Sequence, residues 1–424
     1  MRATTRRSAS AVIVATLVLS ACSAAAGNTD PSGPTTGPAD TAPQVSTTAP
    51  QPTTNSPSTV PGTTAPPATE APSTTLDPVE VFMAAYAYAE PGPHPVGVTT
   101  LSLPMGPEVE VWYPAIQGTT GIDGYDVRDF VPDAIRAVLT ADVPATFVYA
   151  AGRDAWVEPG AFPLVLFSHG FSGMRLNSSF LTSHLASHGM IVVAPDHPSR
   201  TLASVLSGSG SRDPSESVNE LLGALELIVA EGATPGGRFD GHVDADHVVA
   251  LGHSAGGGTV MRAATDERID AYVSMASGIS VDAGEPLPDK PSFFLAGSTD
   301  EVVPAEERTR PAFEAAPSPT RLWIIEGVGH NGFDDFCTFG NGRGIIGVAE
   351  ANGLRALLDA QPQLRTLGED GCVPPSVPVE VSFPIIRHAV TAAIRYELGL
   401  DPAPLGLGPE VAGAYELTVE IAER

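Results

Sequence analysis

Short apolar runs alternate with segments of helical spacing along the chain from about residue 98 onward. Such runs are typical of strands, and they occupy 98–103, 109–113, 162–167, 190–194, 246–251, 269–274, 291–296 and 321–326. Helices are expected over 177–187 and 383–398. Strands that alternate with helices predict a mostly parallel central sheet with right-handed crossovers.

A further helix is expected behind Ser217 and Glu220, which have the spacing of a capping box. Its apolar residues share one face, which we interpret as core packing: Val218, Leu221, Leu222, Leu225, Ile228 and Val229. Residues 117–160 form a long insertion that partly covers the expected site, with a helix near Phe130, Val131, Ile135 and Val138. The tail over 401–424 predicts no element.

The segment Gly252-His253-Ser254-Ala255-Gly256 has the form G-x-S-x-G, with a strand-like run before it and a helix-forming stretch after it. This pattern predicts a nucleophile elbow, a turn so sharp that the neighbours of its serine must be small. The strained tip points the Ser254 hydroxyl out of the sheet. The alternative is a glycine-rich turn that contains a serine by chance.

Asp300 and His330 follow the serine in order, each after a later predicted strand. Ser254, Asp300 and His330 are therefore expected at one sheet edge, where ligands bind in open α/β sheets. The His330 imidazole supplies the base that a serine nucleophile needs, and the Asp300 carboxylate fixes its tautomer. The alternative for Asp300 is a turn former or a cap on a following helix. Rival carboxylates lie nearby in sequence: Glu301, Asp334 and Asp335.

His169 and Gly170 follow the 162–167 run, where esterases place a second oxyanion donor. We assign the two donors to the backbone N–H groups of Phe171 and Ala255. Loss of one such donor typically costs about 2.7–4 kcal/mol of barrier. His169 itself is expected to be structural, bonding the loop and taking no direct part in catalysis.

Short motifs in this order resemble the type II platelet-activating-factor acetylhydrolase family, together with dienelactone-hydrolase-like esterases and bacterial polyester hydrolases. They are W-Y-P at 112–114, F-S-H-G at 167–170, D-H-P at 196–198 and G-H-S at 252–254. The resemblance covers roughly residues 99–398. It implies a single α/β-hydrolase domain that cleaves carboxylic esters, with Ser254, Asp300 and His330 as the triad. Dienelactone hydrolases proper use cysteine, which this chain lacks at the elbow, so their lactone chemistry is not expected.

The first residues have the pattern of an export signal. Arg2, Arg6 and Arg7 precede an apolar stretch, 11–19, that is too short to span a bilayer. The sequence Leu-Ser-Ala-Cys that follows resembles a bacterial lipobox, which implies that Cys22 is lipidated and becomes the first residue of the mature protein. The alternative is an ordinary signal peptide that leaves Cys22 as a free thiol.

Residues 23–77 are rich in Thr, Pro, Ser, Ala and Gly and contain almost no large apolar residue. Such a segment buries too little surface to offset chain entropy, so we predict a disordered tether between a leader over 1–22 and a catalytic domain over 78–424. Its Thr and Pro content also resembles that of O-glycosylated stalks. The formal charge of −27 excludes nucleic acid as the expected partner.

Cys337 and Cys372 lie in a second expected insertion, near 332–380. Export makes a disulfide between them the favoured interpretation, with two buried thiols as the alternative. The bond would close about 35 residues, stabilise the fold by about 3–4 kcal/mol and anchor the loop of His330. A helix is expected within this loop, over 350–358.

The sequence therefore predicts an exported, lipid-anchored serine esterase of short or oxidised acyl chains, lipid esters or polyesters. It is expected to use neither metal nor cofactor, and its partners are the ester substrate and the membrane. Two further hypotheses stay open: a non-catalytic surface lipoprotein, and a peptidase or amidase with the same triad. The intact set of Ser254, Asp300, His330 and the H-G loop favours the esterase. Substrate identity and oligomeric state do not follow from the sequence.

Overall fold

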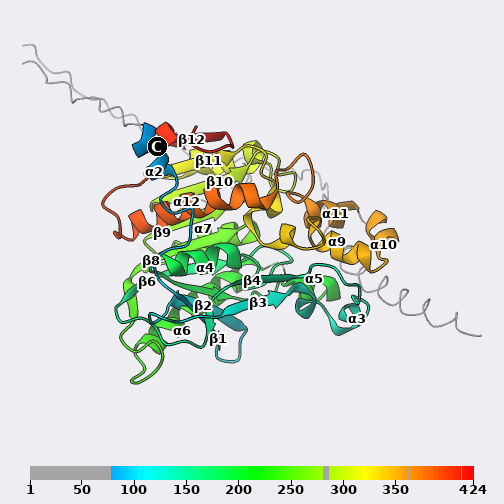
Figure 1. Cartoon of the computed structure of the whole chain (residues 1–424), viewed down its shortest axis with the longest axis horizontal. Coiled ribbons are helices and arrows are strands. Elements are labelled where there is room, and N and C mark those ends of the chain that lie inside the picture. Colours follow the sequence, from blue (N-terminus) through cyan, green and yellow to red (C-terminus); the bar gives the residue numbers. More distant parts are fainter. Residues whose placement is uncertain (1–77, 212, 280–285, 361, 412) are drawn as a thin grey trace, which may run out of the picture. The chain divides into compact units, whose positions relative to one another are not determined.

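The computed structural model describes residues 78–424, apart from 212, 280–285, 361 and 412. At its centre is a ten-stranded sheet with the strand order β12-β11-β10-β9-β8-β6-β7-β2-β1-β5 (Figure 1). The strands from β7 through β6, β8, β9 and β10 to β11 are parallel, as predicted, and β2 and β12 join them antiparallel. Their bounds are β1 (Val96–Ser102), β2 (Glu108–Pro114), β5 (Gly152–Arg153), β6 (Phe162–Ser168), β7 (Ile191–Pro195), β8 (Val243–His253), β9 (Ala271–Met275), β10 (Ser292–Gly297), β11 (Thr320–Ile325) and β12 (Val419–Glu423).

Helices cover both faces of the sheet because its parallel strands are apolar on both sides. In β6, Leu164 packs into one core while Val165 packs into the other. Helices α4 (Ser179–Ser187) and α12 (Val379–Glu397) cover one face, and α6 (Pro214–Gly232), α7 (Ala255–Ala263) and α8 (Arg310–Ala315) cover the opposite face. This layered arrangement is the α/β-hydrolase architecture that the sequence predicts.

The predicted start of α6 is wrong. The helix begins at Pro214, with Asp213 as its cap: the Asp213 carboxylate accepts the backbone N–H of Ser215 at 2.9 Å. Pro at the first helical position favours this earlier start, since it lacks an N–H that would need a partner. Ser217 therefore lies inside the helix with its side chain buried, and the exposed Val229 is not part of the core face.

Both predicted insertions are present, with elements that differ from those expected. In the first, β3 (Ile122–Asp126) and β4 (Thr146–Ala150) form a separate two-stranded sheet, and the expected helix is reduced to the short segments η1 (Val127–Phe130) and α3 (Asp133–Arg136). In the second, a break at 352–354 separates α9 (Gly344–Ala351) from α10 (Arg355–Asp359), so the single helix expected over 350–358 is wrong. α11 (Pro362–Glu369) follows.

The remaining elements lie at the ends of the described chain and in its loops. They are α2 (Pro78–Ala85), α5 (Leu202–Ser207), the π-helical η2 (Ala305–Thr309) and the 3₁₀ turns η3 (His330–Phe333), η4 (Phe336–Thr338) and η5 (Pro409–Val411). None of the helices within the described ranges is long and apolar enough to cross a membrane. The predicted leader and tether, residues 1–77, lie outside the described residues, so these boundaries stay predictions.

Candidate active site

Ser254 lies at a sharp turn between β8 and α7, with φ of 55° and ψ of −122°. This is a strained backbone conformation for a residue that carries a side chain, and such strain is concentrated at functional sites. The flanking glycines are required by space: a Cβ at Gly252 would lie 2.3 Å from the Gly256 carbonyl oxygen, and one at Gly256 would lie 1.9 Å from that of Ser168. The turn is therefore the predicted elbow.

The structure brings Ser254, His330 and Asp300 into one hydrogen-bonded chain. His330 Nε2 lies 2.9 Å from Ser254 Oγ, and His330 Nδ1 lies 2.9 Å from Asp300 Oδ2. The side chains of His330 and Asp300 are almost completely buried, whereas Ser254 is half-buried and reachable. A carboxylate can only accept from the ring, so Nδ1 carries the proton and Nε2 is free to accept the serine hydroxyl proton.

Asp300 also forms the turn that the alternative interpretation predicts. Its Oδ1 accepts the backbone N–H groups of Val302 at 2.9 Å and Val303 at 2.6 Å. One oxygen thus fixes the loop while the other faces His330. Asp300 can therefore order its loop and contact His330 at the same time, because each carboxylate oxygen accepts its own hydrogen bonds.

The rival carboxylates contact other groups. Asp335 accepts the backbone N–H groups of Ser179 at 2.8 Å and Phe180 at 3.0 Å, and so caps the first turn of α4. Asp334 accepts the backbone N–H of Phe336 at 2.9 Å. The Glu301 side chain is exposed. Asp300 is the carboxylate that contacts the His330 ring.

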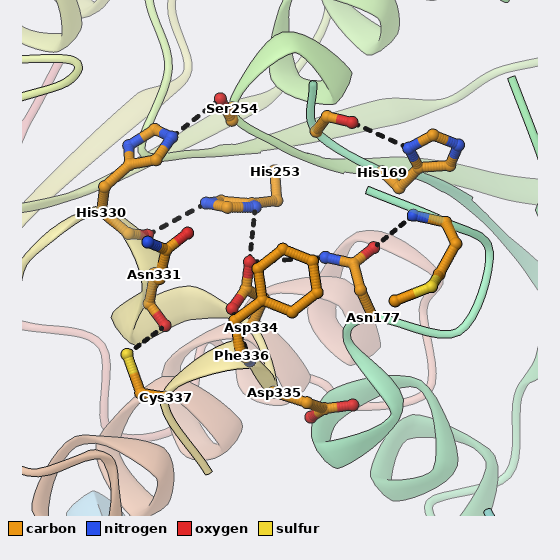
Figure 2. Close-up of polar contacts among 12 residues, drawn as sticks. His169, Asn177, His253, Ser254, His330, Asn331, Asp334, Asp335, Phe336 and Cys337 are labelled. Atoms are coloured by element: carbon orange, nitrogen blue, oxygen red, sulfur yellow. Dashed lines mark hydrogen bonds and ion pairs between the residues drawn. The ribbon is translucent and has the colours of Figure 1, made fainter. Parts of the chain in front are cut away.

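His253, the x residue of the elbow, is buried between the His330 backbone and Asp334 (Figure 2). Its Nε2 donates to the His330 carbonyl oxygen at 3.1 Å, and its Nδ1 faces Asp334 Oδ2 at 3.7 Å. Burial raises the pKa of Asp334 well above its usual range, and burial together with the neighbouring His330 lowers the pKa of His253 well below its own. Both shifts favour the uncharged form of the group concerned.

Hydrogen bonds from the buried Arg200 hold the His169-Gly170 loop in place. One guanidinium nitrogen donates to the His169 carbonyl at 2.7 Å, and the other donates to Thr259 in α7 at 2.9 Å. His169 Nε2 accepts the backbone N–H of His197 at 2.9 Å, so its Nδ1 carries the proton and donates to the Gly170 carbonyl at 2.8 Å. Burial lowers the His169 pKa to about 3. His169 is a loop-bonding residue, as predicted.

The two predicted oxyanion donors, Phe171 and Ala255, lie beside Ser254. Both residues line, with Ser254, an open hollow of about 450 Å³. Neither backbone N–H donates to any of the described residues. Ala255 is the first residue of α7, where helices leave their N–H groups without internal partners. Both groups are thus available to an oxygen atom bound next to Ser254.

Asp370 holds the loop of Asp300 and the loop of His330 together, and it was not predicted from the sequence. Its carboxylate accepts the backbone N–H groups of Glu301 at 2.7 Å, Val302 at 3.1 Å and His330 at 3.2 Å. Burial, and next the nearby Asp300, raise the Asp370 pKa. Cys372, two residues later, is bonded to Cys337, as predicted. The one signal for Asp370 in the sequence was its place two residues before Cys372.

Comparisons with known proteins agree with this geometry. A family described as PET hydrolase-like matches residues 155–350. Platelet-activating factor acetylhydrolase of Cavia porcellus is 26% identical over 57% of this chain and 58% of its own length. Cutinase est1 of Thermobifida alba is 21% identical over 40% of this chain and 53% of its own.

The match to a bis(hydroxyethyl) terephthalate hydrolase of Streptomyces coelicolor is 23% identical and covers 39% of this chain and 49% of that protein. These alignments therefore span about half of the relatives' own lengths. A ferulic acid esterase from Streptomyces cinnamoneus shares the fold: its TM-score is 0.52, with 21% identity over 78% of this chain and 98% of that one. The chain has the fold of the α/β-hydrolases, and the proteins that it resembles are named as hydrolases, a cutinase and an esterase.

Proposed function

We propose that the protein is a serine hydrolase that cleaves carboxylic esters through an acyl-enzyme intermediate. The observation that carries this proposal is the chain from Ser254 Oγ through His330 to Asp300, with 2.9 Å at each step. The strained elbow and the two available N–H groups beside it support the same conclusion. The names of the matched relatives, acetylhydrolase and cutinase among them, agree with it.

In the first half-reaction, Ser254 Oγ attacks the ester carbonyl carbon as its proton passes to His330 Nε2. The carbonyl oxygen takes the negative charge and accepts hydrogen bonds from the N–H groups of Phe171 and Ala255. His330 then gives its proton to the departing alkoxide, which leaves as the alcohol. Asp300 stays ionised and stabilises the imidazolium.

In the second half-reaction, a water molecule replaces the alcohol. His330 Nε2 takes one proton from the water as its oxygen attacks the acyl carbon, and returns that proton to Ser254 Oγ when the acyl–serine bond breaks. The products are the carboxylic acid and the free enzyme. A serine ester links the two halves, so burst kinetics are expected wherever deacylation is the slower step.

Turnover of p-nitrophenyl acetate, with Ser254→Ala as the control, tests the proposal. The substitution is expected to lower kcat by several powers of ten. Residual activity of more than roughly a tenth of wild type would reject Ser254 as the nucleophile. A non-catalytic binding protein predicts no turnover by either form, and an amidase predicts Ser254-dependent cleavage of the matching anilide as well as of the ester.

Export and lipid anchoring at Cys22 belong to the same proposal, on the motif at residues 19–22 and its preceding apolar stretch. We expect Cys22→Ser to leave the precursor unprocessed or to release the enzyme into the medium. Mass spectrometry of the native amino terminus is the measurement. A free, unmodified terminus at any other residue would contradict lipidation.

A further inference from the structure

A second cavity lies beside the active site and is almost entirely aliphatic. Its volume is about 130 Å³, and its walls are Val, Ile, Leu and Ala side chains with one serine and one glycine. No aromatic or charged side chain of the described residues lines it. Apolar cavities of roughly this size stay dry and bind small apolar molecules.

The cavity lies next to the catalytic residues and shares wall residues with the hollow that contains them. Ser172, Ile345 and Leu367 line both this cavity and the small hollow that contains Ser254 and His330. Ser172 directly follows Phe171, the proposed oxyanion donor. The two hollows are therefore adjacent, and a chain attached to an ester carbonyl at Ser254 can extend toward the cavity.

The two insertions and α5 build the walls. Ile135 comes from α3 in the first insertion, Leu202 from α5, and Ala349 and Leu364 from α9 and α11 in the second. Ile135 also packs against Leu206, Leu354 and Leu364 in a small core separate from those of the sheet. The cavity is thus a feature of the inserted segments, added at the edge of the sheet where Ser254 lies.

The larger hollow that Ser254 also lines has a different character. Polar and charged side chains, Thr259, Arg262 and Arg308 among them, lie in its walls, and it is open to solvent. An alkyl chain placed there would keep contact with water and charged groups. The aliphatic cavity is the place where the same chain would lose its contact with water.

We propose that this cavity binds an unbranched aliphatic chain of the ester substrate, so that the preferred substrates are aliphatic esters with a chain longer than acetyl. This rests on the proposed function. A carboxylate or other oxidised group at the end of such a chain would lack a partner in these walls, and an aromatic acid would find no ring to stack on. Charged and aromatic acyl groups are therefore disfavoured.

Two ester series test the proposal and distinguish the source of the chain. One is the p-nitrophenyl esters from acetate to dodecanoate, in which the acyl part varies. The other is the acetates of unbranched alcohols from methanol to dodecanol, in which the alcohol part varies. In the series whose varied chain occupies the cavity, kcat/KM is expected to rise by up to about fourfold per methylene and then to level off once the cavity is filled.

Filling the cavity provides the matched variant. Ala349→Phe places a ring in the cavity from α9, and Ala351→Phe adds the same ring to the exposed surface of the same helix as the control. We expect Ala349→Phe to lower kcat/KM for the octyl substrate at least tenfold relative to acetate, and Ala351→Phe to leave this ratio unchanged. Leu206→Trp, on α5, repeats the test from a different element of the wall if Ala349→Phe does not fold.

The outcomes separate the two claims. If wild type hydrolyses acetate but kcat/KM is flat or falls with chain length in both series, the aliphatic subsite is wrong and the esterase stands. If folded filling variants keep the wild-type chain-length profile, the chain binds elsewhere and the proposal is again wrong. If no ester is cleaved at all, the proposed function itself fails.

Discussion

His330 is held at every polar atom it has. Its two ring nitrogens face Ser254 and Asp300, its backbone N–H donates to Asp370, and its carbonyl accepts from His253. An imidazole fixed in this way keeps both its tautomer and its distance to the serine. Such positioning matters because a misplacement of about 1 Å can cost on the order of a hundredfold in rate.

Replacement of Asp300 by asparagine tests this arrangement. The amide can donate to His330 Nδ1 and so favours the tautomer whose Nε2 carries a proton and cannot take one from Ser254. We expect kcat to fall by roughly 10⁴ with little change in the melting temperature. Steady-state kinetics on p-nitrophenyl acetate give the result.

Asp334→Asn is the matched control, since Asp334 faces His253 and not the His330 ring. It should lower kcat far less than Asp300→Asn. An unchanged rate in Asp300→Asn, with the loss instead in Asp334→Asn, would move the acid to the histidine loop.

At this scale the sequence carries the triad and not its supports. Ser254, Asp300 and His330 follow from the elbow and from the order of the strands, because each lies at the end of a parallel strand. Asp370 comes from the second insertion, and its only sequence signal is its place two residues before Cys372. Glu220 and Ser217 have the spacing of a cap, yet their side chains face His197 and Arg200.

At the scale of elements, α6 supports the His169-Gly170 loop through Glu220. Its carboxylate lies 2.7 Å from His197 Nδ1, and His197 Nε2 lies 2.8 Å from Ser168 Oγ. Burial raises the pKa of Glu220 from 4.5 to about 7. A pKa raised by folding means that the protonated form stabilises the fold below about pH 4.5, and that this contribution is lost as the pH rises through 7.

Glu220→Gln removes this titration. We therefore expect the melting temperature of wild type, relative to Glu220→Gln, to fall between pH 5 and pH 8. Solvent screening limits the effect to about 1 kcal/mol, or roughly 2 °C. Thermal melts of both proteins at the two pH values measure it, and a difference that does not vary with pH would contradict the assignment.

The disulfide connects the second insertion to the histidine loop. Loss of the bond in Cys372→Ser is expected to cost about 3–4 kcal/mol of stability, because the 35-residue separation between the cysteines is then unconstrained in the unfolded chain. Activity should fall with it, since Asp370 lies two residues away and holds His330. Melting curves and kcat test both effects.

Alkylation of free thiols in the native protein tests this pairing. Two free thiols at Cys337 and Cys372 would refute the bond. A lower melting temperature with full activity would show that the bond stabilises the fold without positioning His330.

The strands were predictable because β6 to β11 are buried on both faces and read as apolar runs. β12 (Val419–Glu423) was not predictable, because its apolar residues alternate with glutamates and it lies at the edge of the sheet, paired with β11. The helices of the insertions were also missed or misplaced. They are short and depend on contacts with one another, which local periodicity does not encode.

At the scale of the molecule, the catalytic groups lie at one edge of the sheet, and the two insertions contribute walls of the cavity beside them. The formal charge of −27 argues against a nucleic-acid partner, and the aliphatic cavity is the basis of the proposed preference for aliphatic esters. The fold class followed from alternating strands and helices. The cavity did not, because its walls come from segments far apart in the chain.

The central claim is that Ser254 forms a covalent bond with the substrate's acyl group. Incubation with a fluorophosphonate, followed by peptide mass spectrometry, tests it most directly. We predict one adduct, on Ser254 in wild type, and none in Ser254→Ala; His330→Ala should label far more slowly, because the base is missing. An adduct on another residue, or equal labelling of Ser254→Ala, would contradict the account.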